Sequence, residues 1–312
     1  MTSSNSQGHF LTLFAFCLVI QGCTARVIDT SRVIDIGNGR SMFLECKGNG
    51  RPTVILVTGL GERADDWMIT TNNKKPVFQG VASFTTVCAY DRPGTAKATE
   101  KGLELSRSTS ISYKATVKDS AEDLNALLAA SGEPAPYVLV GHSLGGPIIR
   151  LYASEHPDKV AAFVFDDALS EYLIDGLDEE QVRLFKKLND PDFQGRPPNS
   201  EDALFSEAVV PLMRAAKPPP QVPTIILTAD QWVLPELIAS GKLPKWVNQP
   251  FSDALWKSQI EAQNKFAALF KGAKHVTETN ADHYIHHTQP QLVIDSIREV
   301  VDQVRSASES HP

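Results

Sequence analysis

Ser143 lies in a pattern that can make a serine hydroxyl reactive. Gly141, His142, Ser143, Leu144 and Gly145 follow an apolar run typical of a buried strand, and a helical pattern follows them. Such a Gly-x-Ser-x-Gly turn is so tight that a Cβ atom on either outer glycine would clash, which leaves the serine exposed at the tip. Ser143 is therefore the candidate nucleophile, the alternative being a serine that only caps the helix. The side chain of His142 should point away from it and pack or line a pocket.

A serine nucleophile needs a histidine to accept its proton and a carboxylate to orient that histidine. Histidines downstream of Ser143 gather near the end of the chain, at His275, His283, His286 and His287. Carboxylates suited to the orienting role follow two predicted strands, and they are Asp166, Asp167 and Asp230.

A metal site is the alternative for His283, His286 and His287. No glutamate lies between them as in the zinc-binding helix of metalloproteases, and no carboxylate is in the expected register. A Gly-rich loop that could cradle phosphates is also missing from the sequence. We therefore expect neither a metal nor a cofactor.

Short β-branched runs alternate with helical stretches from about residue 32 onward. Strands are predicted at 32–36, 40–46, 53–58, 85–90, 137–140, 160–165, 224–228 and 273–278. Helical patterns cover 117–131, the stretch after Ser143 as far as Glu155, and 290–305. This alternation predicts an α/β fold with a mostly parallel central sheet flanked by helices.

The strand pattern lapses between about residues 171 and 222. Charged helical sequence there ends in Pro218, Pro219 and Pro220, and we expect an inserted helical cap within one domain spanning 26–312. The alternative is a surface excursion. A second irregular stretch, 231–251, carries Trp232 and Trp246 and should border the same pocket.

Residues 1–25 are predicted to be a signal peptide. The apolar run 10–20 is shorter than the roughly 20 residues that cross a bilayer, and small residues follow it, although no Lys or Arg precedes it. Cleavage after Ala25 would release a soluble protein. Residues 20–23 also resemble a bacterial lipoprotein signal, so membrane association is expected only if Cys23 is lipidated. The expected location is periplasmic or secreted.

The composition suits one large globular domain, with 312 residues that are 42% hydrophobic and 21% charged. The net charge is −7, and no basic stripe is present that could bind a phosphate backbone. Nucleic acid is therefore excluded as a partner, and the sequence leaves the oligomeric state open.

Four stretches together resemble the α/β-hydrolase superfamily, and they are 90–94, 140–146, 156–160 and 282–286. The resemblance spans about residues 31–305 and is strongest to exported bacterial esterase-like members. It implies His283 as the base, with His286 a weaker candidate, because His283 follows the last strand and precedes a helix. It implies Asp230 as the acid, after strand 224–228, with Asp166 and Asp167 as the runner-up position.

The resemblance also implies an oxyanion hole made by the backbone N–H groups of Leu60 and Leu144. Thr58 stands where many relatives have histidine, which matters little because the main chain donates the hydrogen bonds. Asp91 and Arg92 should fix the loop after the fourth strand. Trp67 is expected either to floor the pocket or to pack in the core.

Cys46 and Cys88 lie in predicted strands that this fold makes neighbours. In an exported protein they could form a disulfide, and the alternative is two buried thiols.

The implied reaction is cleavage of a small-molecule ester, as in a carboxylesterase or lactonase, through an acyl-enzyme on Ser143. Esters are favoured by family frequency alone. The alternatives are an amidase or peptidase, for which Glu171, Asp175, Asp178 and Glu179 could bind a free amino terminus, and a ligand-binding protein that retains the fold.

Overall fold

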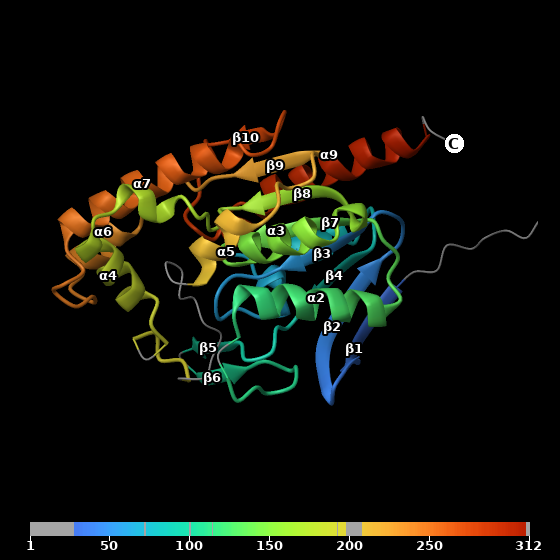
Figure 1. Ribbon diagram of the computed structural model, residues 1–312, viewed down its shortest axis with the longest axis horizontal. Coiled ribbons are helices and arrows are strands. Elements are labelled where there is room, and N and C mark those ends of the chain that lie inside the picture. The colour runs from blue at the N-terminus through green and yellow to red at the C-terminus, as the bar shows by residue number, and fades with distance from the viewer. Residues whose placement is uncertain are drawn as a thin grey trace, which may run out of the picture.

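A computed structural model of the chain describes residues 28–71, 73–99, 101–113, 115–191, 193–197 and 208–309, so the predicted signal peptide lies outside the described residues. Eight strands of the described part form one sheet, and they are β1 (Ile28–Gly37), β2 (Arg40–Gly48), β3 (Thr53–Val57), β4 (Val87–Tyr90), β7 (Tyr137–His142), β8 (Val160–Asp166), β9 (Thr224–Leu227) and β10 (Lys274–Val276). Their spatial order is β1-β2-β4-β3-β7-β8-β9-β10 (Figure 1).

The sheet is parallel from β4 to β10, and β2 pairs antiparallel with both β1 and β4. Every residue of β3, β4, β7 and β9 is buried, as expected for parallel strands with both faces covered. The predicted α/β class and mostly parallel sheet are thus confirmed.

Helices cover both faces of this sheet (Figure 1). The apolar core on one face includes residues of α2 (Val117–Ser131) and α3 (Gly145–Glu155), and the core on the other includes residues of α1 (Val77–Val81) and α9 (Pro290–Glu309). Helix α2 begins where the Thr116 side chain accepts a hydrogen bond from the Asp119 N–H, and it ends at Gly132, whose φ of 78° closes the helix.

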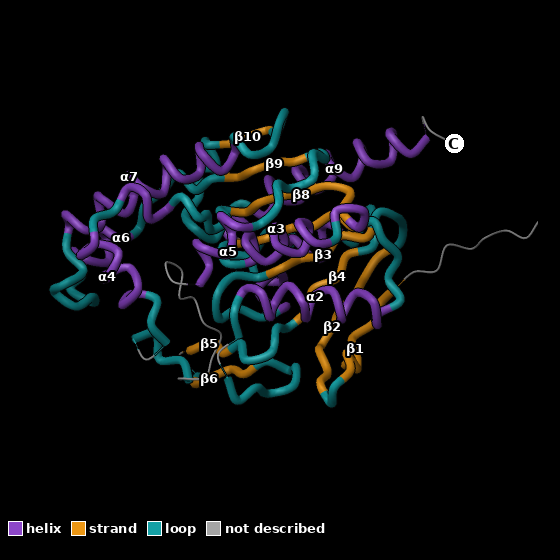
Figure 2. The backbone as a smooth tube through the Cα atoms, viewed as in Figure 1, coloured by secondary structure: helices purple, strands orange, loops and turns teal. Residues whose placement is uncertain are grey.

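Further helices lie at the end of the sheet where the parallel strands end (Figures 1 and 2). Between β8 and β9 the described segments include η3 (Leu173–Gly176), α4 (Glu179–Leu188) and α5 (Val210–Ala215), and between β9 and β10 they include α6 (Leu234–Ala239) and α7 (Gln249–Ala267). The shorter elements are η1 (Ala64–Met68), β5 (Ala96–Thr99), β6 (Gly102–Leu105), η2 (Pro157–Lys159) and α8 (Ile285–Thr288). No described helix combines the length and apolar character needed to cross a bilayer.

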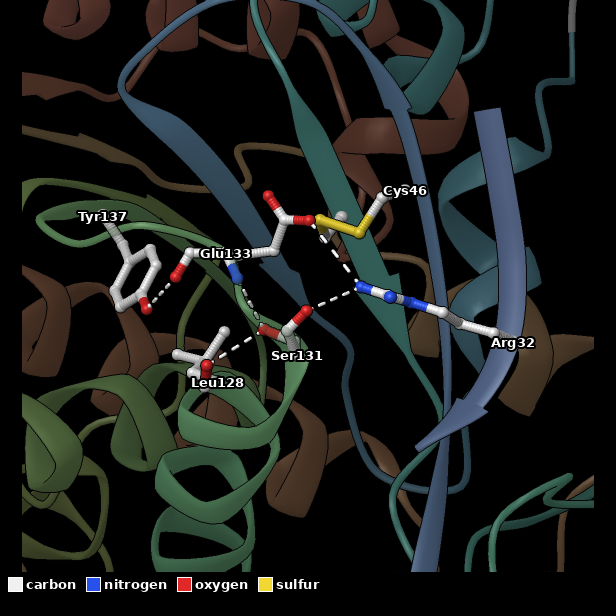
Figure 3. The surroundings of a disulfide bond; sticks show 7 residues. Arg32, Cys46, Leu128, Ser131, Glu133 and Tyr137 are labelled. Carbon is white, nitrogen blue, oxygen red and sulfur yellow. Dashed lines mark hydrogen bonds and ion pairs between the residues drawn. A yellow bond between two sulfur atoms is a disulfide. The ribbon is translucent and has the colours of Figure 1, made fainter. Parts of the chain in front are cut away.

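Cys46 and Cys88 form a disulfide that joins β2 to β4 (Figure 3). The two residues are direct partners in the antiparallel register, and both side chains are fully buried. Nearby, Arg32 ties β1 to the end of α2 by donating a hydrogen bond of 2.8 Å to the Ser131 carbonyl oxygen. Of the two alternatives left open for these cysteines, the structure contains the disulfide.

Replacing both Cys46 and Cys88 by alanine is expected to lower the free energy of unfolding. The disulfide separates its cysteines by 42 residues, and a closed loop of that size removes about 4 kcal/mol of chain entropy from the unfolded state. Urea unfolding of the protein without residues 1–25, with and without reductant, measures the effect. Reductant should destabilise the wild type and leave the double variant unchanged; a wild type indifferent to reductant would contradict the prediction.

Candidate active site

Ser143 sits at the tip of the turn between β7 and α3, in a left-handed backbone conformation with φ of 49°. A Cβ atom added to Gly141 would lie 2.8 Å from the Gly145 carbonyl carbon, and one added to Gly145 would run into the Val57 carbonyl oxygen. The expected steric need for both glycines is therefore confirmed. The Ser143 N–H donates to the Asp166 carbonyl oxygen at 3.2 Å, which ties the tip of the turn to the end of β8.

His283 lies in the segment after β10, and its Nδ1 donates to Oδ2 of Asp167 at 2.6 Å. The imidazole is 42% exposed, whereas the Asp167 side chain is 4% exposed. Oδ1 of the same carboxylate accepts the Ala229 N–H at 3.0 Å, which fixes its orientation. A buried carboxylate thus holds a partly exposed imidazole in the tautomer that leaves Nε2 unprotonated.

The prediction that Asp230 orients this histidine is wrong. Asp230 is exposed, and its Oδ1 accepts hydrogen bonds from the Ala281 N–H at 3.0 Å and the Thr279 hydroxyl at 3.3 Å. Its carboxylate therefore closes the turn that leads into His283 instead of contacting the imidazole. The runner-up position after β8 supplies the partner, and its sequence signal was the Asp166-Asp167 pair at the end of a buried strand.

Asp166 contacts His286, whereas the adjacent Asp167 contacts His283. Oδ2 of Asp166 accepts from Nδ1 of His286 at 2.6 Å, and both side chains are buried. Burial raises the pKa of Asp166 to about 7 and lowers the pKa of His286 well below its ordinary value. His286 is thus a neutral, enclosed group, which makes it unsuitable as the base that meets a substrate.

His142 is completely buried and contacts the loop after β3. Its Nδ1 lies 3.0 Å from Oε2 of Glu62, and its Nε2 lies 2.9 Å from the carbonyl oxygen of His283. The expectation that this side chain packs instead of acting as the base agrees with its full burial. Glu62 was not singled out from the sequence, where a single glutamate after a glycine-rich loop carries no distinctive signal.

Ser143 and His283 open together onto an apolar cavity of about 240 Å³. Its walls come from η3, α4, α7 and the loop after β9, so the helical segments at the end of the sheet build it. The apolar lining residues are Leu169, Leu173, Phe185, Leu188, Ala229, Trp232, Leu255 and Trp256. The expectation that Trp232 borders this pocket is confirmed, whereas the Trp246 ring packs on Phe193 at 5.3 Å between centroids.

A second, more polar cavity of about 480 Å³ meets the first at Ser143 and His283. Leu60 lines it, so the backbone predicted to hold an oxyanion lies in the same cavity as the serine. Leu144 directly precedes α3, where the helix N-terminus favours negative charge. Ser143 and His283 are therefore located between an apolar cavity and a more polar one.

The loop that carries Leu60 is held in place by Asp91 and Arg92, which follow β4. Arg92 donates to the Thr58 carbonyl oxygen at 2.7 Å, and Asp91 accepts the Ala64 N–H at 2.9 Å and the side chain of Arg107. Both residues therefore hold the loop after β3. Asp91 also fixes the segment after the fourth strand, as expected, through its contact with Arg107. Trp67 is 1% exposed and packs in the core with its ring 4.6 Å from that of His286, which settles the alternative left open for it.

One set of described histidine and carboxylate donors is compact enough to be tested for a metal, namely Glu62, His142 and His286, whose donor atoms all lie within 4.8 Å of one another. His142 Nδ1 points straight at the Glu62 carboxylate, however, and two acceptors at hydrogen-bond distance require a proton between them. The histidine set considered from the sequence, His283, His286 and His287, does not converge, because His283 binds Asp167 and His287 Nε2 binds the Asp66 carbonyl oxygen.

Solved structures resemble this chain in fold. A thermophilic esterase from Thermogutta terrifontis aligns with a TM-score of 0.57 and 17% identity, covering 88% of this chain and 99% of that one. Est816, described as an N-acyl homoserine lactone degrading enzyme, aligns with a TM-score of 0.56 and 15% identity over 86% of this chain and 99% of its own. An E-2-(acetamidomethylene)succinate hydrolase aligns with a TM-score of 0.54 and 18% identity over 88% and 100%. At these identities the likeness shows the fold alone.

Two curated relatives match part of the chain. An uncharacterized protein of Schizosaccharomyces pombe is 31% identical over 149 residues, which are 41% of this chain and 26% of the relative. The uncharacterized protein YqjL of Bacillus subtilis is 25% identical over 126 residues, 40% of this chain and 43% of the relative. The matched segments span less than half of either relative.

The family model described as the alpha/beta hydrolase fold matches residues 52–259 of the 312. The matched range runs from the start of β3 through Ser143 and Asp167 into α7, so it includes the turn at Ser143 and most of the central sheet. The chain belongs to the α/β-hydrolase fold family.

Proposed function

We propose that this protein is a serine hydrolase that cleaves a small-molecule ester through an acyl-enzyme, with Ser143 as nucleophile, His283 as base and Asp167 as the orienting acid. The observation that carries the proposal is the pairing of a partly exposed imidazole with a buried carboxylate, 2.6 Å apart, beside a cavity that also contains Ser143. The fold neighbours include esterases and other hydrolases, which is consistent with this chemistry and does not select the bond.

In this reaction His283 Nε2 takes the Ser143 proton while Oγ attacks the ester carbonyl carbon. The backbone N–H groups of Leu60 and Leu144 bind the oxygen that becomes negative, and the N-terminus of α3 adds to that stabilisation. His283 then gives its proton to the leaving alcohol, and water, deprotonated by the same base, releases the acid. Asp167 stays ionised and stabilises the imidazolium throughout.

The proposed substrate carries an apolar acyl group in the apolar cavity. Its volume of about 240 Å³ exceeds the roughly 150 Å³ cavity that admits benzene in another protein. The polar cavity, at the other side of Ser143, gives the alcohol an exit and water an entrance. Medium-chain or aromatic acyl esters fit this division better than large polar esters.

Replacing Trp256 by alanine should weaken selection for long acyl groups. The Trp256 ring lines the apolar cavity and stacks on Trp232 with centroids 5.1 Å apart. Loss of about 80 Å² of apolar contact at 25 cal/mol per Å² corresponds to roughly 2 kcal/mol, or about 30-fold. The measured quantity is kcat/KM for p-nitrophenyl octanoate divided by kcat/KM for the acetate. Trp246→Ala is the control, and an equal loss on both esters in Trp256→Ala would refute the acyl assignment.

The acidic residues that an amidase or peptidase could use to bind a free amino terminus do not face Ser143. Glu171 pairs with Arg150 at 2.6 Å, and Asp175 pairs with Arg214 at 2.5 Å and Lys265 at 3.4 Å. Asp178 caps α4 by accepting the Gln181 N–H, and Glu179 is exposed on that helix. None of the four lines either cavity at Ser143, which favours an ester over a substrate with a charged amino terminus.

The experiment that tests the proposal combines covalent labelling with turnover. The purified protein is treated with a fluorophosphonate, the modified residue is located by mass spectrometry, and p-nitrophenyl butyrate and the matching anilide are offered as substrates. We expect a label on Ser143 and faster cleavage of the ester. A protein that takes no label and cleaves neither substrate would instead be a binding protein with this fold.

Export is proposed as well, supported by the disulfide between Cys46 and Cys88, because disulfides persist mainly in oxidising compartments. Whether the chain ends as a soluble periplasmic or secreted protein or is anchored through Cys23 is decided by mass spectrometry of the mature N-terminus.

A further inference from the structure

A buried side-chain pair behind Ser143 joins the three segments that form the proposed reaction centre. These are the loop with Leu60, the turn with Ser143 and the segment with His283. The link runs from the Gly59 N–H to Oε2 of Glu62 at 2.7 Å, from Glu62 to His142 Nδ1 at 3.0 Å, and from His142 Nε2 to the His283 carbonyl oxygen at 2.9 Å.

The chemistry of these contacts fixes the protonation of His142. A carbonyl oxygen can only accept a hydrogen bond, so Nε2 must carry a proton. Burial disfavours the charged Glu62 carboxylate, but the charge of His142 outweighs burial and holds the pKa of Glu62 well below its ordinary value. The carboxylate is therefore ionised and can only accept, from the Gly59 N–H and from Nδ1, so Nδ1 must carry a proton too. His142 is therefore an imidazolium paired with a carboxylate, and both side chains are almost inaccessible to solvent.

The backbone around the pair is shaped to admit it. A Cβ atom on Gly59 would lie 2.9 Å from Nδ1 of His142 and 3.0 Å from Oε2 of Glu62, so the pair fits only against a glycine. Gly61 has φ of 72°, which lets the loop turn back and bring Glu62 beneath Gly59.

We propose that Glu62 and His142 form a positioning ion pair that sets the Leu60 loop and the His283 segment at their working distance from Ser143. The inference rests on the proposed serine hydrolase reaction. His142 lines neither cavity at Ser143, and Glu62 borders only the polar one. They act through the main chain on both sides of the nucleophile, where a misplacement of about 1 Å can cost 10²-fold in rate.

The pair gives the enzyme a sensitivity to alkaline pH. Burial disfavours the charged imidazole, but the Glu62 carboxylate outweighs it and raises the pKa of His142 to about 9. Because the folded pKa is raised, the stabilisation is complete below the unfolded value near 6.5 and is lost as pH rises through about 9. The titratable groups that face His142 from neighbouring segments are Glu62, Asp166, His283, Tyr284, His286 and His287.

Substitutions at Glu62 separate positioning from simple stability. Glu62→Gln can place either its oxygen or its amide nitrogen where Oε2 lies, so it keeps one of the two contacts, with the Gly59 N–H or with a neutral His142, and kcat at pH 7.5 should fall less than in Glu62→Ala. Glu62→Ala removes the link, and kcat should fall about 10- to 100-fold with KM nearly unchanged. The fall of kcat above pH 9 in wild type should disappear in Glu62→Gln. Glu171→Gln, in the buried pair with Arg150, is the matched control and should keep the wild-type pH profile.

Histidine ¹⁵N NMR reads the pair without substrate, with the His142 signal assigned from His142→Gln. We expect an imidazolium up to about pH 9 in wild type and a neutral ring in Glu62→Gln at neutral pH. Titration of His142 at its ordinary pKa, or wild-type kcat in Glu62→Ala, would overturn the proposal while leaving the esterase proposal standing. A wild type that is neither labelled nor active overturns the esterase proposal, and the NMR result then still decides the ion pair.

Discussion

Ser143→Ala is expected to reduce kcat for p-nitrophenyl esters by about 10⁴- to 10⁶-fold, down to the small rate that the rest of the site still supports. The loss is large because Ser143 supplies the hydroxyl at the tip of the β7–α3 turn, and alanine leaves no atom there to attack the ester. Removal of Oγ leaves the backbone hydrogen bonds of residue 143 intact. Its N–H donates to the Asp166 carbonyl oxygen, and its own carbonyl oxygen accepts from the N–H groups of Gly146 and Leu169. The melting temperature should therefore hardly change.

Steady-state kinetics, fluorophosphonate labelling and thermal unfolding of the same preparation check this expectation. Ser240→Ala is the matched control, because Ser240 is exposed and its hydroxyl makes only local contacts, donating to the Leu237 carbonyl oxygen and accepting the Lys242 N–H. Undiminished turnover in Ser143→Ala, with the label on another residue, would show that the catalytic serine had been misassigned.

The sheet could be predicted from sequence because its signals are local. Runs such as those of β3 and β7 are apolar on both faces and bounded by turn residues, and burial of such runs leaves few alternatives to a parallel sheet. The turn at Ser143 was equally readable, since glycines at Gly141 and Gly145 have a steric cause within the same few residues.

The partner of His283 could not be predicted with the same certainty because it depends on where side chains point at two strand ends. Asp166 is the last residue of β8, and Asp230 lies in the loop after β9. Asp167 comes directly after β8, with φ of 41°. That left-handed backbone sends the Asp167 carboxylate toward His283 while Asp166 turns to His286. The residue at which the strand ends and the loop begins decides which aspartate faces His283. A hydrophobic pattern does not locate that boundary to within one residue.

Glu62 illustrates a different limit. Its role comes from contacts with His142, which lies 80 residues away, and with the backbone of Gly59, so no local pattern distinguishes it from a solvated glutamate. Only the complete burial of His142 and the two acceptors on either side of its ring make the pair visible.

Asp167→Asn should reduce kcat by about 10³- to 10⁴-fold, whereas Asp230→Asn should stay within about threefold of wild type. Asparagine at 167 can still accept the Ala229 N–H, but it no longer provides the negative charge that stabilises the His283 imidazolium, and its amide can favour the wrong tautomer. At position 230 the asparagine oxygen can still accept the hydrogen bonds from Ala281 and Thr279, so the turn before His283 keeps its shape.

These two variants form a matched pair, because each changes one carboxylate into an amide of the same size in a loop after a neighbouring strand. Measured with p-nitrophenyl butyrate under saturating conditions, kcat reports the transition-state interaction, and thermal unfolding reports any change in the fold. If Asp230→Asn proved the slower enzyme, Asp230 and not Asp167 would be the residue that orients His283 in the reacting complex. The 2.6 Å contact between Asp167 and His283 would then belong only to the resting protein. If Asp167→Asn loses activity while keeping its melting temperature, the charge on Asp167 acts on the reaction itself, because a purely structural loss would lower both.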